Sequence, residues 1–370
     1  MSRHFFKTLK IERFRGIQSL EIGGLERVNV FVGKNNCGKT SVLEAAFLLC
    51  DISNPDLLIG MQNIRGVGVN EGSDDLRDFF YQRNHEKGIE LTVSQVEGQR
   101  KLRITPLYGN LQAGQVSGGP STVLGNSGTM RAPHFAETSI PGQSLTGIHY
   151  DFVVRDKANK HGDYEATTRW TKPGNNEFTS SFDSQYKETM PSCYMARQGY
   201  NQTFVDRMLH AKRKDLLLRT LQSVDPNVAD IRTNSQGLVA VDTGLDSFVP
   251  INLLGDGIMR ILNILSTIEY VSDGILFIDE IERGLHVTSV ERVWEVILDH
   301  SEKSNVQIFL TTHSADVIKS VRNVLDRKLF SDSVACYRLV KFERDDKTRA
   351  YRYSSEQLSQ ALDSGTDIRL

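Results

Sequence analysis

The sequence has few cysteines, no long hydrophobic run and almost no net charge, and each absence excludes a class of protein. Its four cysteines are scattered along 370 residues without any CxxC pair. We therefore expect neither a disulfide framework nor a cysteine-based metal site, and a reducing cytoplasm suits such a chain. The cysteines are Cys37, Cys50, Cys193 and Cys336.

Membrane and fibrous architectures are also excluded by what the sequence lacks. No stretch reaches the roughly eighteen apolar residues that span a bilayer, and the first residues contain no apolar core of a signal peptide. No heptad repeat predicts a coiled-coil arm. The net charge of −2 excludes a surface that is basic throughout, although a local basic patch for nucleic acid stays open. We expect a cytoplasmic protein that contacts no membrane.

Short apolar runs alternate with helical patterns in two parts of the chain. The runs at 28–32, 275–279 and 306–310 are rich in β-branched and aromatic residues, which predicts buried strands. Helices are predicted from Thr40 onward and at 198–222, 257–269 and 288–300. Strands separated by helices of this length indicate a parallel sheet.

The remaining segments have a more β-like character. Residues 5–22 predict a hairpin that bends at Gly16, and strands are expected at 89–108, 148–172 and 177–183. Residues 109–147 are rich in Gly, Ser, Thr, Asn and Pro, so we expect a long loop there. The last part predicts strands at 334–342 and 348–353 and a helix at 355–363.

A glycine-rich loop follows the first predicted buried strand and matches GxxxxGK[ST]. Such a loop turns backbone N–H groups and a helix N-terminus toward phosphate oxygens. Lys39 would neutralise the β- and γ-phosphates of ATP, and the Thr40 hydroxyl would bind Mg²⁺. The alternative is a chance glycine-rich turn. The predicted nucleotide-binding residues here are Gly33, Asn35, Asn36, Cys37, Gly38, Lys39, Thr40 and Ser41.

Two later strand ends carry polar residues that complement this loop. Asp279 and Glu280 follow the run ILFI, at the end of a strand where ligands gather in parallel sheets. Asp279 would hold Mg²⁺ together with Thr40, and Glu280 would polarise the attacking water. Thr311, Thr312 and His313 end the next strand, and His313 could sense the γ-phosphate. The predicted catalytic residues are therefore Glu280, His313 and Lys39. A helix cap at Asp279 and a structural histidine are the plain alternatives.

In this order the three elements resemble those of ABC-type ATPases. The FRGI start, the GKNNCGKTS loop and the DEIERGLH run at 279–286 narrow the resemblance to the RecF/SMC-like branch. The chain is most similar to the ATPase part of OLD-family proteins and to AAA_15/AAA_21 ATPases. The resemblance implies an α/β fold of the ABC-type P-loop NTPase, with a mixed sheet and an N-terminal antiparallel hairpin. We expect the ATPase domain at 1–50 and 191–330, a β-rich insertion with a long loop at 51–190, and C-terminal strands and a helix at 331–370.

The resemblance also implies contacts with a second subunit. The family closes a signature loop over ATP bound to a partner copy, and the matching residues are Gly255, Asp256 and Gly257, which depart from the LSGGQ form. A plain turn with a helix cap is the alternative. The resemblance further implies a homodimer or larger homo-oligomer that uses Mg²⁺ with ATP. Further candidates are a Q-loop at 75–78, the hairpin residues Arg13 and Arg15, and His286 at the dimer seam. An ordinary amphipathic helix is the alternative at 75–78, and solvent-exposed strand arginines are the alternative for Arg13 and Arg15.

OLD nucleases carry a Toprim domain with an acidic cluster, and the residues after His313 lack its DxD pattern. We therefore expect a separate effector protein, for which a nuclease is one candidate, controlled by this ATPase in bacterial anti-phage defence. A RecF-like DNA-repair ATPase is the alternative, and Lys212, Arg213, Lys214 and Arg219 could contact nucleic acid phosphates or simply form a solvated helix face. The FRGI start argues against a transporter subunit, and Glu280 argues against a scaffold that binds ATP without hydrolysis.

Overall fold

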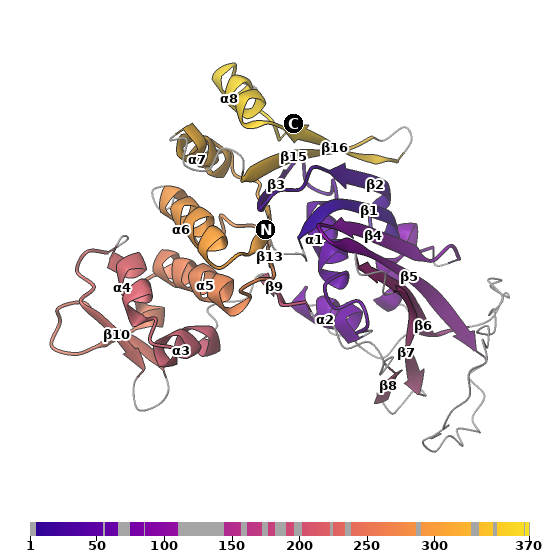
Figure 1. Ribbon diagram of the computed structural model, residues 1–370, viewed down its shortest axis with the longest axis horizontal. Helices are drawn as coiled ribbons and strands as arrows, with labels where there is room; N and C mark the ends of the chain where they lie inside the picture. Colours follow the sequence, from indigo (N-terminus) through magenta and orange to yellow (C-terminus); the bar gives the residue numbers. More distant parts are fainter. Residues whose placement is uncertain are drawn as a thin grey trace.

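Three sheets and the helices packed on them make up the computed structural model of the chain (Figure 1). The structure describes residues 5–54, 56–65, 75–84, 86–109, 144–156, 161–171, 177–181, 190–195, 202–222, 225–233, 238–285, 290–326, 333–342, 346–365 and 367–369. In this part of the chain, no helix is long and apolar enough to cross a membrane.

The central sheet has six strands in the order β16-β15-β3-β14-β13-β9, and all neighbours except β15 and β16 run parallel. Every residue of β3, β13 and β14 is buried, because these strands are continuous apolar runs covered on both faces. The predicted parallel sheet is thus confirmed. Its strands are β3 (Val28–Val32), β9 (Ser192–Met195), β13 (Ile275–Ile278), β14 (Gln307–Thr311), β15 (Val334–Lys341) and β16 (Thr348–Tyr353).

Helices cover the two faces of this sheet with two separate cores. Phe31, Phe277 and Phe309 belong to the core on the side of α1, whereas Val30, Ile278 and Leu310 belong to the core under α5, α6 and α7. Successive strand residues therefore point to opposite cores. The helices are α1 (Lys39–Leu48), α5 (Asp256–Tyr270), α6 (Val290–Lys303), α7 (Ala315–Asp326) and α8 (Ser355–Asp363).

The second sheet is antiparallel and has seven strands in the order β2-β1-β4-β5-β6-β7-β8. The predicted N-terminal hairpin is β1 and β2, and the strands predicted in the middle of the chain extend the same sheet from the edge of β1. Helix α1 lies between this sheet and the parallel one (Figure 1). The strands are β1 (Phe6–Phe14), β2 (Ile17–Gly23), β4 (Ile89–Gln95), β5 (Gly98–Gly109), β6 (Ser144–Asp156), β7 (His161–Thr171) and β8 (Glu177–Ser181).

The long loop predicted at 109–147 was placed too far toward the C-terminus at its end. Residues 144–147 belong to β6, because they pair with the last residues of β5, where Gly109 lies opposite Ser144. Residues 110–143 lie outside the described residues. Two short helices that were not predicted precede β4, namely α2 (Asp56–Ile64) and the 3₁₀ helix η2 (Tyr81–Arg83). The 3₁₀ helix η1 (Asp75–Phe79) lies where an amphipathic helix was the alternative to a Q-loop.

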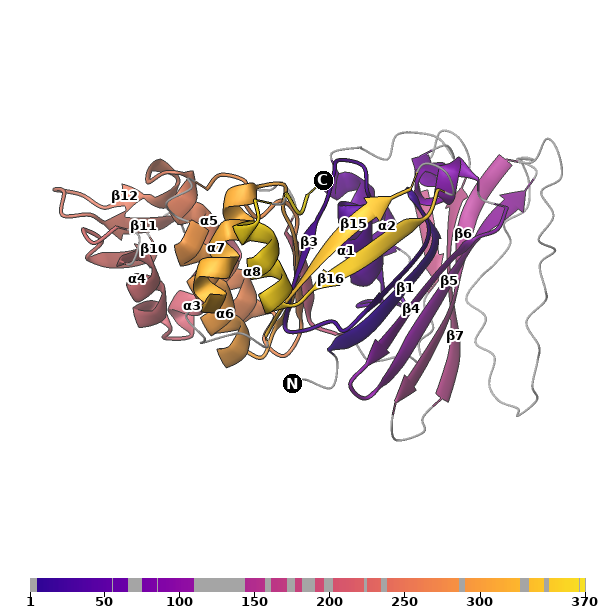
Figure 2. The ribbon, with the colours of Figure 1, turned by 90° about the horizontal axis from the view of Figure 1, so that it is seen from above.

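The third sheet lies at the far end of the molecule from the antiparallel sheet (Figure 2). It consists of β10 (Asp230–Thr233), β11 (Val239–Asp242) and β12 (Val249–Pro250), and the 3₁₀ helix η3 (Ile251–Leu253) follows. These strands were not predicted, because runs of two to four residues show no periodicity.

The single helix predicted at 198–222 is two helices in the structure. Helix α3 (Gln202–His210) and helix α4 (Lys214–Gln222) are separated by a break at which Lys212 adopts a left-handed φ of 58°. A non-glycine residue rarely takes this conformation inside a helix. The basic residues of this segment therefore surround a turn, and they do not form one continuous helix face.

Gln307 joins the two large sheets through a fully buried side chain. Its amide nitrogen donates to the carbonyl oxygens of Phe6 (2.9 Å) and Glu26 (2.8 Å), and its Oε1 accepts from the Phe6 N–H (2.8 Å). Both backbone hydrogen-bonding groups of Phe6 are therefore bonded to this one amide.

We predict that Gln307→Leu lowers the free energy of unfolding by about 1–3 kcal/mol. The substitution hardly changes the side-chain volume but leaves the backbone groups of Phe6 and Glu26 without their hydrogen-bond partner. Urea unfolding of the two proteins measures the difference. Gln360→Leu, at an exposed position of α8, is the matched control and should stay within about 0.5 kcal/mol of the parent. Equal stabilities of Gln307→Leu and the parent would contradict the bridging role.

Candidate active site

The carboxyl ends of β3, β14 and β13 meet at one edge of the parallel sheet. Each strand is followed there by polar residues: the glycine-rich loop after β3, Thr311 and His313 at the end of β14, and Asp279 after β13. Because the three strands are parallel and adjacent, segments far apart in sequence converge on the same place.

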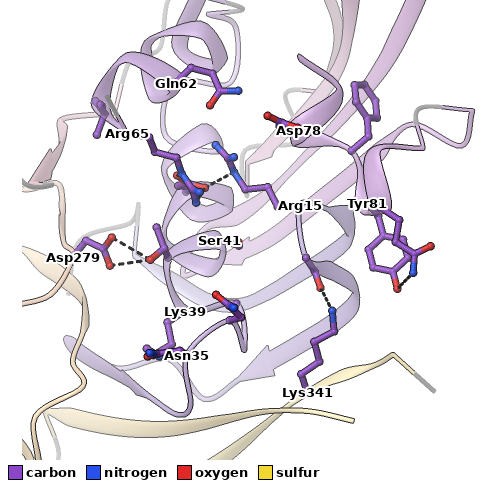
Figure 3. A pocket seen from close by; sticks show the side chains of 18 of the residues that line it. Arg15, Asn35, Lys39, Ser41, Gln62, Arg65, Asp78, Tyr81, Asp279 and Lys341 are labelled. Carbon is purple, nitrogen blue, oxygen red and sulfur yellow. Dashed lines mark hydrogen bonds and ion pairs between the residues drawn. The ribbon is translucent and has the colours of Figure 1, made fainter. Parts of the chain in front are cut away.

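A cavity of about 1170 Å³ opens at this edge and extends toward the turn between β1 and β2 (Figure 3). Asp279 lies at one end of it, whereas Tyr81 and Lys341 lie at the other. Most of the predicted site residues line this cavity: Asn35, Asn36, Gly38, Lys39, Thr40, Ser41, Asp279, Glu280 and His313.

The loop before α1 has the backbone of a phosphate cradle. Gly33 takes a φ of 143°, and a Cβ there would lie 2.5 Å from the Leu339 carbonyl oxygen and 2.8 Å from the Cys37 sulfur. Gly38 caps α1 with a left-handed φ of 100°. Only glycine combines such dihedrals with such close neighbours, so the loop's shape depends on these two residues.

Lys39 and Cys37 pack against the inner side of this loop. The Lys39 ammonium donates to the carbonyl oxygens of Gly33 (2.8 Å) and Lys34 (2.9 Å), and burial lowers the pKa of this lysine. Cys37 is only 4% exposed, and burial raises the pKa of its thiol. Among the described residues, the cavity lining includes neither Cys37 nor Gly33, so these two shape the loop from beneath.

Thr311 connects the acidic strand end to the rest of the site. Its hydroxyl donates to Asp279 Oδ1 (2.6 Å) and accepts from the Glu280 N–H (2.8 Å). The Thr40 hydroxyl donates to the same carboxylate of Asp279 at 3.1–3.2 Å. One threonine therefore fixes both the Asp279 side chain and the backbone of Glu280, which adopts a left-handed φ of 51°. The sequence placed Thr311 at this edge without indicating that it links the two acids.

His313 reaches the cavity on a backbone held from two sides. Its N–H donates to Glu282 Oε1 (2.6 Å), and its carbonyl oxygen accepts from Arg369 Nη1 (3.0 Å). Arg369 is itself paired with Asp367, and this arginine lowers the pKa of the Asp367 carboxyl to about 2. As expected, His313 and residues of the glycine-rich loop line the same cavity.

A buried carboxylate holds two arginines over the middle of the cavity. Glu44 of α1 contacts Arg15 Nε at 2.5 Å and Arg65 Nε at 2.6 Å. The Arg15 guanidinium also lies 4.4 Å from the centre of the Phe79 ring, and burial lowers the pKa of this arginine to about 10. Neither Glu44 nor Arg65 was predicted, because no local pattern indicates that a helix carboxylate is paired with two distant cations.

Of the two hairpin arginines expected near the nucleotide, only Arg15 lines the cavity. Arg13 instead donates to the Gly88 carbonyl oxygen (2.9 Å) and pairs with Glu90 (3.4 Å). Strand alternation alone would place these two residues on one face, but Arg13 and Arg15 adopt left-handed φ values of 59° and 51°, and the turn between them separates their side chains.

The remaining family-derived candidates lie outside this cavity or beside it. Gly255 caps α5, and Asp256 and Gly257 form its first turn, away from the cavity lining that the same chain provides. Residues 75–78 fall in a 3₁₀ helix, whose Asp78 lines the cavity. The strand beside β13 is β9, and the Asp279 N–H donates to the carbonyl oxygen of Met195, the last residue of β9 (3.0 Å). His286 lies outside the described residues.

Two of the four cations of the basic cluster after α3 are paired with carboxylates. Arg213 pairs with Glu269, and Lys214 lies 2.6 Å from Asp230. Cations that already contact carboxylates offer less to a phosphate backbone than free ones do.

Two family models match different parts of the chain. The model described as "AAA domain, putative AbiEii toxin, Type IV TA system" matches residues 136–319, and the model "AAA ATPase domain" matches residues 5–99. Between them they include the glycine-rich loop, Asp279, Glu280 and His313. Both models thus overlap residues that line the cavity.

Curated relatives and solved structures add weaker likenesses. An "ATP/GTP phosphatase" of Helicobacter pylori is 22% identical over 92% of this chain and 93% of its own length. The "DNA replication and repair protein RecF" of Acinetobacter baylyi is 49% identical over 41 residues, which are 11% of this chain and 12% of that protein. The SMC head domain of Thermotoga maritima aligns with a TM-score of 0.43 at 10% identity, over 94% of this chain and 99% of that one. A structure of the SmcHead bound to the C-winged helix domain of ScpA aligns with a TM-score of 0.47 at 9% identity, over 96% and 99%.

One conclusion follows from the strand–loop–helix at Gly33, the acidic end of β13 and the two ATPase family models. The predicted fold class is confirmed: the chain has an α/β fold of mixed parallel and antiparallel sheets, and models of ATPase domains match the two parts of it that meet at the cavity.

Proposed function

We propose that the cavity binds a nucleoside triphosphate, ATP in the first instance, and hydrolyses its terminal phosphate. The observation that carries this proposal is the Thr311 hydroxyl, which joins Asp279 and Glu280 opposite Thr40 and the buried Lys39. A purely structural helix cap at Asp279 would not need a carboxylate shared by hydroxyls from two other elements. The name of the Helicobacter pylori relative supports a triphosphate substrate.

The triphosphate would lie on the loop from Gly33 to Ser41, at the N-terminus of α1. The backbone N–H groups and the helix dipole there favour anions. Lys39 would leave the carbonyl oxygens of Gly33 and Lys34 and turn its ammonium to the β- and γ-phosphates. Arg15 lies further along the cavity, where its guanidinium would offset phosphate charge while Glu44 keeps it in place.

The donor set at Thr40 and Asp279 suits Mg²⁺. A hydroxyl oxygen and a carboxylate oxygen are the hard ligands that Mg²⁺ prefers, and they lie 3.1–3.2 Å apart. The described residues contain no group of three or more His, Cys, Asp or Glu side chains that could hold a metal by themselves. The ion would therefore arrive with the nucleotide and neutralise the charge that develops on the phosphates.

Glu280 would orient the attacking water, and His313 would contact the terminal phosphate. Both residues line the same end of the cavity as Asp279. Catalysis would consist mainly of positioning and charge neutralisation, since phosphoryl transfer requires little covalent chemistry from the protein. Loss of the phosphate would then be transmitted through the His313 backbone to Glu282 and Arg369.

We further propose that ATP drives assembly of two or more copies and that this assembly controls a separate effector in anti-phage defence. The N-terminus of α5, with Gly255, Asp256 and Gly257, would close over the nucleotide of the partner copy. The family model that matches residues 136–319 is described by a toxin–antitoxin system, which supports this role. The short match to RecF favours a second candidate, a DNA-binding repair ATPase. ATP-dependent, salt-sensitive binding to duplex DNA without any partner would distinguish the second from the first.

We predict opposite effects from two substitutions in the cavity. Lys39→Ala should abolish measurable nucleotide binding, because it removes the cation nearest the phosphates. Glu280→Gln should bind ATP normally but release phosphate at least about 100-fold more slowly, and should accumulate as an ATP-bound assembly. Equilibrium binding, phosphate release and light scattering measure the three quantities. Normal turnover by Glu280→Gln would refute the role of this carboxylate.

Thr311→Val tests the connecting hydroxyl. We expect turnover to fall about 10- to 100-fold, and the Mg²⁺ concentration for half-maximal activity to rise, because Asp279 and Glu280 lose their shared support. Thr267→Val is the matched control, since this threonine is equally buried but bonds only within α5. Unchanged Mg²⁺ dependence in Thr311→Val would mean that the hydroxyl serves folding alone.

A further inference from the structure

We propose that Tyr81, Gln82, Lys341 and Asp346 form the subsite that selects the nucleotide base, and that its hydrogen-bonding pattern fits guanine. GTP would then be a substrate at least as good as ATP. This inference rests on the proposed function, because it assumes that the triphosphate lies on the glycine-rich loop.

The direction of the cavity determines where a base would lie. Asp279, Glu280 and His313 occupy one end, so the terminal phosphate belongs there. The nucleoside must then extend along the cavity in the opposite direction, past Arg15. The residues at that opposite end are the ones named above, which come from η2 and from the hairpin of β15 and β16 (Figure 3).

These four residues already form a connected polar cluster. Gln82 Nε2 donates to the Tyr81 hydroxyl (3.1 Å) and to Asp346 Oδ2 (2.9 Å). Lys341 Nζ lies 2.9 Å from Asp346 Oδ1 and donates to the Gly16 carbonyl oxygen at 3.2 Å. Segments that are 264 positions apart in sequence therefore meet at the end of the cavity.

The hydrogen-bonding capacity left over in the cluster is specific. The two described bonds of Gln82 use both of its amide hydrogens, which leaves its Oε1 as an acceptor. Lys341 has three N–H donors, of which two are used within the described residues, and each Asp346 oxygen can accept a further bond. The cluster thus offers carboxylate and amide acceptors beside one ammonium donor.

Guanine is the base that complements this arrangement. Its N1–H and N2 amino group donate side by side and suit a carboxylate, while its O6 accepts and suits a lysine. Adenine presents an unprotonated N1 where guanine has N1–H, so a carboxylate there would face a lone pair. The half-buried Tyr81 ring stands beside the cluster, where it could stack on either purine.

The backbone of the cluster is strained, so the surrounding structure must hold it in this position. Gln82 and Asp346 both adopt a left-handed φ of 51°, which is uncommon for residues other than glycine and costs free energy. The Arg15 N–H donates to the Phe79 carbonyl oxygen (2.8 Å), which docks η1 and η2 on the β1–β2 turn. The competing explanation is that the Lys341–Asp346 pair only fastens the β15–β16 hairpin to that turn. Fastening would alter stability without altering the choice between bases.

A specificity swap at Asp346 separates the two explanations. We would measure dissociation constants of the full chain for Mg²⁺ complexes of GTP, ATP and xanthosine triphosphate, in the Glu280→Gln background that prevents turnover. Asp346→Asn should raise the dissociation constant of GTP about 10-fold and that of ATP less than about twofold, since the lost contact is specific to guanine. The same substitution should lower the dissociation constant of xanthosine triphosphate, because xanthine has a carbonyl where guanine has its amino group. That carbonyl oxygen can accept a hydrogen bond from the new amide.

The control is Asp299→Asn, which breaks a Lys–Asp pair of 2.6 Å on the exposed face of α6 and should leave all three constants unchanged. Equal weakening of every nucleotide by Asp346→Asn, no change at all, or a parent chain that binds ATP but not GTP would overturn the base subsite alone. A parent chain that binds no nucleotide would overturn the proposed function as well, so the two failures can be told apart.

Discussion

The parallel register of β3, β14 and β13 is the constraint on which the rest of the site depends. It brings the glycine-rich loop, Thr311 and Asp279 to one edge, although the loop is more than two hundred residues from the other two in sequence. The strands are buried on both faces, so a one-residue slip would move every side chain into the opposite core, whose packing it does not fit. The short Thr311–Asp279 hydrogen bond of 2.6 Å is a direct result of that register.

The antiparallel sheet supplies the other half of the cavity. Its β1–β2 turn carries Arg15 and Gly16, and the segment before β4 carries Asp78 and Tyr81, so the hairpin region forms a wall that the parallel sheet alone could not provide. Helix α1 is packed between the two sheets and presents Glu44 to the cations on both sides. Breaking that buried carboxylate–arginine set would leave unpaired charges, which is costly in a protein interior. The wall and the phosphate loop therefore hold each other in place.

Contiguous features could be predicted from the sequence, and long-range ones could not. The loop from Gly33 to Ser41, the acids at 279–280 and the buried strands are local patterns with a direct physical meaning. The helix break at Lys212 was missed because its neighbours continue a helical pattern on both sides. The Glu44 pairing and the contact of Gln82 with Asp346 depend on how distant segments pack, and a single sequence contains no periodicity that reports such contacts.

The most direct test of the central claim is a crystal structure of the Glu280→Gln chain grown with ATP and Mg²⁺. We expect the triphosphate on the loop before α1, with the terminal phosphate beside Lys39, the ion against the Thr40 and Asp279 oxygens, and the base toward Tyr81. Phosphates bound at the Tyr81 end, or a nucleotide bound outside the cavity under saturating conditions, would contradict the account.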